Sequence, residues 1–148
     1  MRLLSPLALS LAVLAPAAAR AADGLDDAKK LQGEWTITDW YQGGVTMPVA
    51  RLSTVRWAIT GDKYAFALGD SEEEGTVKVD ATKKPPAIDL AVATGEAKGR
   101  EQLGIFKVDG DVVTICLARP GKDRPTEFTS TRSNRQILMT VKRARKVG

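Results

Sequence analysis

The sequence predicts an all-β fold: an up-and-down barrel of eight antiparallel strands preceded by a short helix. Three observations lead to this prediction. Apolar and polar residues alternate with a period of two in segments of about five to eight residues. Two links between these segments, Gly61-Asp62 and Asp109-Gly110, have the chemistry of two-residue hairpin turns. After residue 32 no amphipathic helical pattern remains to cover a parallel sheet, so neighbouring strands are expected to pair antiparallel.

The first 21 residues have the composition of a secretory signal peptide. Arg2 gives a positive start, residues 3–15 are an apolar run, and Ala19-Arg20-Ala21 is a small-x-small cleavage site. The run is shorter than the ~20 residues that a helix needs to cross a bilayer, so a retained anchor is the weaker interpretation. We therefore expect residues 1–21 to be removed and residues 22–148 to form one barrel domain, secreted or located in the periplasm.

The composition excludes several classes of function. The chain of 148 residues has no His and a single Cys, so His-based acid–base relays, Cys-His nucleophile systems and Cys/His zinc sites lack their parts. We expect no enzyme activity, no metal and no cofactor. The leader holds two of the 22 basic residues, which leaves 20 against 18 acidic residues. A net charge of +2 on the mature chain does not indicate a nucleic-acid partner.

The expected elements follow in order along the mature chain. A short helix at residues 25–32 has acids at its start and lysines at its end, as a helix dipole favours, and Gly33 ends it. Eight strands are then expected at residues 34–40, 54–60, 63–68, 75–79, 88–92, 102–108, 112–117 and 137–143. Residues 42–53 and 118–134 are long loops, and the second could contain a ninth strand at residues 127–131.

A closed barrel is favoured over an open sheet because closure removes exposed strand edges. A two-sheet sandwich is the alternative architecture. In the first strand, alternation places Trp35, Ile37 and Asp39 on one face. If that face is interior, the Asp39 carboxylate needs a partner or water.

Gly33-Glu34-Trp35, after a short helix and at the start of the first strand, resembles the Gly-x-Trp motif of lipocalin-like barrels. In that family the Trp plugs one end of the barrel and a basic residue of the last strand packs across it. Lys142 or Arg143 is placed to do so here.

A wider resemblance covers most of the mature chain, from Leu31 to Arg143. The chain is similar to an uncharacterised planctomycete-type family of small exported domains, usually described as lipocalin-like. This resemblance implies the fold and export but no particular activity, and Asp39 departs from the small neutral residue expected at its position. The segments that carry it are Leu31 to Trp35, Gly61 to Lys63, Lys84-Pro85, Ile88 to Leu90, Gly104-Ile105, Asp109 to Asp111, Cys116 and Arg124 to Phe128.

The candidate ligand-binding residues are apolar side chains assigned to the barrel interior. The expected wall consists of Trp57, Tyr64, Phe66, Leu90 and Ile105. The alternative is that these side chains simply fill a small barrel.

Arg124, in a proline-flanked loop, is the candidate polar contact for a ligand carboxylate or phosphate. A charge pair with Asp89 that fixes the loop is the favoured interpretation of the same residue, with Phe128 anchoring the loop against the barrel rim.

Three other features have simpler interpretations. Cys116 is expected to be a buried small residue; an intermolecular bridge and a redox thiol are the alternatives. Asp70 to Glu74 lacks the ligand spacing of a calcium loop and is expected to be a solvated hairpin tip. The basic residues at the C-terminus are expected to form a solubilising tail, and contact with anionic polysaccharide or lipid headgroups is the alternative.

Together these expectations favour an exported, non-enzymatic binding module for a small, partly apolar ligand, monomeric or weakly associating and without an integral membrane span. The second class is a structural or protein-interaction domain of the cell envelope, whose loops contact a partner protein. The third is an enzyme that uses carboxylates such as Asp39 and Asp89, although no spacing places two of them together.

Overall fold

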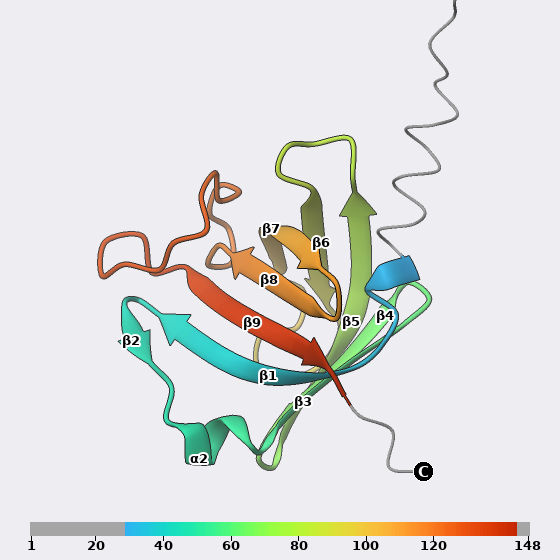
Figure 1. The fold of residues 1–148 in the computed structure, drawn as a ribbon, viewed down its shortest axis with the longest axis vertical. Coiled ribbons are helices and arrows are strands. Elements are labelled where there is room, and N and C mark those ends of the chain that lie inside the picture. Colours follow the sequence, from blue (N-terminus) through green and yellow to red (C-terminus); the bar gives the residue numbers. More distant parts are fainter. Residues whose placement is uncertain (1–28, 145–148) are drawn as a thin grey trace, which may run out of the picture.

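The computed structural model describes residues 29–144, which form a closed up-and-down barrel of antiparallel strands (Figure 1). Each of the eight barrel strands pairs with the next, and the last pairs with the first. The predicted barrel is therefore confirmed, and the sandwich alternative is wrong. The strands are β1 (Gly33–Gln42), β3 (Val55–Thr60), β4 (Lys63–Leu68), β5 (Ser71–Asp80), β6 (Ala87–Val92), β7 (Glu101–Asp109), β8 (Val112–Leu117) and β9 (Ile137–Arg143).

The core lies inside the barrel and consists of alternate side chains from every strand. Alternation produces this core because successive side chains of a strand point to opposite faces of the sheet. The buried core residues are Leu31, Trp35, Ile37, Trp40, Leu52, Val55, Trp57, Ile59, Tyr64, Val77, Ile88, Leu90, Phe106, Val113, Ile115, Leu117, Met139 and Val141.

One end of the barrel is closed by Trp35 and the chain that precedes it. Trp35 is 2% exposed, and its Nε1 donates a hydrogen bond to the Leu31 carbonyl at 2.9 Å. The Arg143 guanidinium lies 4.5 Å from the centre of the Trp35 ring and donates to the carbonyls of Gln32 at 2.8 Å and Lys30 at 2.9 Å. Of the two basic residues expected to cover Trp35, Arg143 does so.

A β-bulge corrects the expected orientation of Asp39. The pairing of β1 with β9 shifts register between Ile37 and Asp39. The extra residue turns the Asp39 side chain to the exposed outer face and brings Trp40 inward, where it is 8% exposed. The prediction that Asp39 shares the face of Ile37 is wrong, and the structure leaves no carboxylate at that core position.

The first long loop contains two short elements that were not expected. Strand β2 (Val45–Thr46) folds back on the end of β1, and helix α2 (Val49–Leu52) follows it. Leu52 of this helix is 5% exposed and joins the core.

Two other expectations about the loops are wrong. Residues 127–131 form no strand, because their backbone-to-backbone hydrogen bonds run within the loop, such as that from Thr129 N to Glu127 O at 3.0 Å. Strand β5 begins at Ser71, so only residues 69–70 form the turn before it, and Glu73 points into the barrel.

The expected N-terminal segments fall largely outside the described residues. Lys29 and Lys30 are helical, which agrees with the end of the helix expected at residues 25–32, and residues 25–28 of that helix are not described. The expected signal peptide, residues 1–21, also lies outside the described part of the chain. Between residues 29 and 144, no helix is both long enough and apolar enough to cross a membrane.

Candidate functional site

The half of the barrel interior opposite Trp35 contains a cavity of about 230 Å³. Ala97 and Pro120 line the cavity from the loops at residues 93–100 and 118–136. The cavity therefore opens towards these two loops. All eight barrel strands contribute as well. The lining residues are Trp40, Trp57, Tyr64, Phe66, Glu73, Leu90, Ala97, Gln102, Leu117, Pro120, Ile137 and Met139. Four of the residues expected in the wall, Trp57, Tyr64, Phe66 and Leu90, are therefore brought together here.

Two inward-facing glycines let large side chains lie close to the barrel wall. A Cβ atom on Gly75 would lie 2.7 Å from Cε1 of Tyr64 and 2.1 Å from the Ala91 carbonyl oxygen, so the Tyr64 ring packs directly on the backbone of β5. A Cβ atom on Gly104 would lie 2.5 Å from Cδ2 of Leu117. At both positions the absence of a side chain lets a cavity-lining residue pack against the backbone of the wall.

The cavity wall is mainly aromatic and aliphatic, with few polar groups. The rings of Trp40 and Phe66 lie 5.9 Å apart, centre to centre. The Tyr64 hydroxyl donates to Oε1 of Glu73 at 2.8 Å. Burial, together with this bond, raises the pKa of Tyr64 above its usual range, so the hydroxyl remains a donor at neutral pH.

Trp40 contributes a polar atom without a partner. Its Nε1 is buried and has no hydrogen-bond partner among the described residues, although Trp40 as a whole is 8% exposed and lines the cavity. A buried donor left unsatisfied costs about 1–3 kcal/mol.

Ile105 does not line the cavity, which corrects its expected place in the wall. In β7 the inward positions are Gln102, Gly104 and Phe106, and Ile105 alternates with them on the outer face. It is nevertheless 1% exposed, because the loop at residues 118–136 covers this part of the barrel. The physical reason for the misassignment is that both faces of β7 are apolar here, so alternation alone does not identify the inner one.

Arg124 also lies outside the cavity. Asp89 alternates with the inward residues Ile88 and Leu90, so its carboxylate is on the outer face of β6. The Arg124 guanidinium donates to Asp89 Oδ1 at 2.5 Å and to the Gly104 carbonyl at 2.8 Å. The predicted charge pair between Arg124 and Asp89 is confirmed, and the expected role of Arg124 as a ligand contact does not match this placement.

The same loop buries Cys116 on the outer face of β8. The thiol is 0% exposed, donates to the Thr129 carbonyl at 3.4 Å and accepts from Nε2 of Gln136 at 3.3 Å. Burial raises the pKa of the Cys116 thiol, so it is protonated and shielded at neutral pH. Phe128, expected to anchor the loop, packs beneath the ammonium of Lys107, which is 4.8 Å from the ring centre.

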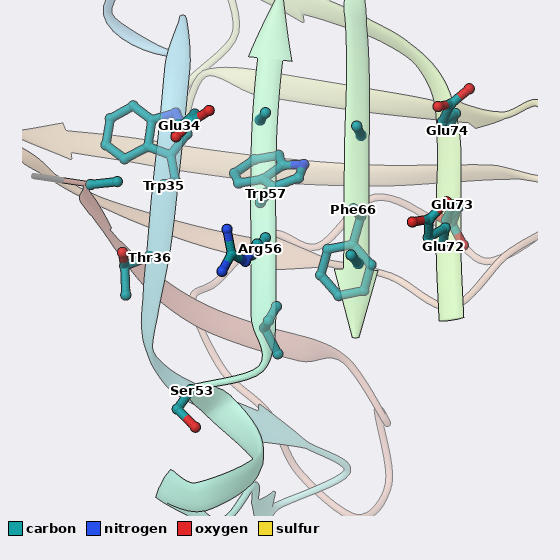
Figure 2. A pocket seen from close by; sticks show the side chains of 15 residues that line it. Glu34, Trp35, Thr36, Ser53, Arg56, Trp57, Phe66, Glu72, Glu73 and Glu74 are labelled. Atoms are coloured by element: carbon teal, nitrogen blue, oxygen red, sulfur yellow. The ribbon is translucent and has the colours of Figure 1, made fainter. Parts of the chain in front are cut away.

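A larger hollow of about 450 Å³ lies on the outside of β1, β3, β4 and β5. Figure 2 shows Glu34 on one side of it and Glu72 and Glu74 on the other, with β3 and β4 between them. Its floor includes small side chains such as Ala65, and the acids around it are exposed. Hydrated charges around a floor of alanines enclose an apolar ligand less well than the interior cavity does.

Several lining residues were not predicted from the sequence. Leu117 and Met139 alternate correctly within their expected strands and could have been found from that pattern. The inward orientation of Trp40 could not be predicted, because the bulge in β1 changes the face on which its side chain lies. The inward orientation of Glu73 was also not predicted, because it belongs to a run of acidic residues that was expected to be an exposed turn.

Comparisons with protein-family models, with curated proteins and with solved structures found no match. Within residues 29–144, no cluster of three or more Cys, Asp or Glu side chains has the arrangement to hold a metal ion.

Proposed function

We propose that the protein is an exported, non-enzymatic binding module that holds a small, mainly apolar molecule in the open half of its barrel. The observation that carries this proposal is the cavity itself, whose mainly aromatic and aliphatic wall includes the hydrogen-bonded Tyr64 and Glu73 as polar groups. Pockets for small molecules typically combine an apolar wall with a few polar groups that orient the ligand.

The size of the cavity limits the size of the ligand. A dry protein cavity of about 150 Å³ binds benzene, which has six non-hydrogen atoms. By the same proportion, a cavity of about 230 Å³ fits roughly nine such atoms. The ligand is therefore a small ring system or a medium-length chain.

Binding of 1-octanol tests the proposal, because this molecule has an eight-carbon chain and one oxygen that can accept a hydrogen bond. Burying eight methylene-sized groups contributes roughly 6 kcal/mol, and ordering costs reduce this gain, so a dissociation constant of about 0.1 mM or weaker is expected. Trp40 and Trp57 line the cavity, so intrinsic fluorescence reports occupancy and calorimetry provides the affinity.

A matched pair of variants localises the binding. Ala97 lines the cavity from the loop at residues 93–100, so Ala97→Trp is expected to obstruct the mouth and abolish octanol binding. Ala93 is exposed and borders the outer surface, so Ala93→Trp is expected to leave binding unchanged. Absence of octanol binding to the unmodified protein, or equal binding to both variants, would refute a binding role for the cavity.

Export is tested separately. The amino-acid sequence predicts that cells release a chain beginning at Ala22, which amino-terminal sequencing of the protein from the culture medium or periplasm would detect. Recovery of the uncleaved chain from the cytoplasm would contradict export without affecting the argument about the cavity.

A further inference from the structure

Three arginines line a second hollow, of about 300 Å³, at the end of the barrel where the cavity opens. They are Arg119, Arg132 and Arg135, and the hollow is completed by Gln42 and Gly43. All three arginines are exposed. The ion pairs between described residues, Arg124 with Asp89 and Arg143 with Asp111, involve none of them. The hollow therefore gathers three positive charges without a carboxylate to balance them.

Residues that line this hollow are neighbours of cavity-lining residues along the chain or across the sheet. Arg119 lies between Leu117 and Pro120, both of which line the cavity. Gln42 pairs in register with Ile137, another cavity residue, and Arg135 precedes Ile137 by two positions. Because consecutive Cα atoms are about 3.8 Å apart, the backbone of Arg119 and that of Arg135 lie within about 8 Å of cavity-lining residues.

The loop at residues 118–136 is held in place by its own hydrogen bonds. Arg135 has φ of 51°, which is uncommon for a residue other than glycine, and its backbone N donates to the Thr131 carbonyl at 2.9 Å. Oδ1 of Asn134 accepts from the backbone N of Thr131 at 2.9 Å and of Gln136 at 3.0 Å. Figure 1 shows this loop projecting beside the end of β1 and the beginning of β9. These bonds hold the backbone of residues 131–136, which includes Arg132 and Arg135.

We infer that the ligand is an anionic amphiphile, whose apolar body occupies the cavity and whose carboxylate or phosphate head binds Arg119, Arg132 and Arg135. This inference rests on the proposed function of the cavity. A guanidinium group is suited to such heads because its planar donors match two anion oxygens at once.

The test compares four ligands that share one eight-carbon chain: octanoate, octyl phosphate, 1-octanol and octylammonium, each titrated at pH 7.5 into the protein produced from the full-length sequence. Octanoate or octyl phosphate is expected to have a dissociation constant at least about tenfold lower than that of 1-octanol, because the anion gains a charge-assisted hydrogen bond to an arginine. Octylammonium is expected to bind more weakly than either anion. A gain for one anion alone supports the inference and identifies the head group.

Variants of the arginines separate the contribution of the anionic head group to binding from that of the apolar body. The double variant Arg119→Gln/Arg135→Gln is expected to bind the anions no better than 1-octanol while retaining 1-octanol affinity, which also shows that it is folded. Arg100→Gln removes one exposed charge from the other loop at this end and is the matched control, expected to bind like the unmodified protein.

Three outcomes would overturn the inference. If 1-octanol binds and neither anion binds more tightly, the cavity takes neutral ligands and the proposed function stands. If anions bind equally well after Ala97→Trp, the arginines bind a head group without the cavity. If none of the four ligands binds, the inference and the proposed function both fail.

Discussion

The ion pair between Asp89 and Arg124 is expected to stabilise the loop at residues 118–136, which carries the three arginines of the hollow. The variant Asp89→Ala measures the contribution of this pair to the free energy of unfolding. Both side chains are 21% exposed and their atoms are 2.5 Å apart. Fully exposed ion pairs contribute about 0–1 kcal/mol, whereas hydrogen bonds to charged groups contribute about 1.5–3 kcal/mol. Because the pair is largely buried and Arg124 also donates to the Gly104 carbonyl, the second range applies.

We therefore expect Asp89→Ala to lower the free energy of unfolding by about 2 kcal/mol, because it leaves a partly buried guanidinium without its carboxylate. For a domain of this size that corresponds to a decrease of about 8 °C in Tm. Urea unfolding followed by tryptophan fluorescence measures the first quantity. The control is Asp111→Ala, whose exposed pair with Arg143 spans 3.7 Å and is expected to change stability by less than about 0.5 kcal/mol.

Limited proteolysis tests whether the effect is local to the loop. Trypsin cuts poorly before proline, and Arg119 and Arg124 each precede one, so Lys122 is the cleavage site in this stretch. Asp89→Ala is expected to accelerate cleavage after Lys122. Unchanged unfolding free energy together with unchanged cleavage would refute the assignment of this pair as the contact that fixes the loop.

Two further predictions concern the wall and the covered face. Gly75→Ala is expected to lower the free energy of unfolding by about 3 kcal/mol, because the added Cβ would meet the Ala91 carbonyl at 2.1 Å and the Tyr64 ring. Urea unfolding measures this loss, and a change below about 0.5 kcal/mol would contradict the prediction. Cys116 is expected to resist thiol reagents in the native protein at pH 8. Because the fold raises its pKa, its stabilising contribution is present below the unfolded-state value of about 8.5 and is lost as pH rises through the folded-state value. Unfolding free energy should therefore fall above about pH 8.5 more steeply than in Cys116→Ala; parallel pH profiles would contradict this.

The strands were predictable because each has a local pattern. Val55, Trp57 and Ile59 alternate with polar residues or small ones, so a single segment already identifies its inner face. The hairpin turns at residues 61–62 and 109–110 also depend only on local chemistry, and the structure places turns there.

The site was less predictable because it depends on contacts between distant segments. The bulge that turns Trp40 inward arises from pairing with β9, about one hundred residues further along the chain. Ile105 is buried by a loop that packs on the outside of the barrel, so its burial resembles that of a core residue. The rim arginines are gathered from both ends of a loop with no regular secondary structure, and no periodicity marks them.

The amino-acid sequence by itself determined the class of the fold and the order of the strands, because side-chain alternation and turn chemistry act over a few neighbouring residues. The contact of Trp35 with a basic residue of the last strand was implied by the resemblance to the Gly-x-Trp motif. Only the tertiary structure decided which faces of β1 and β7 are interior, that the open half of the barrel is hollow, and that three arginines stand beside its mouth. These properties depend on the register of strands and on loop packing, and both are set by the closure of the whole barrel.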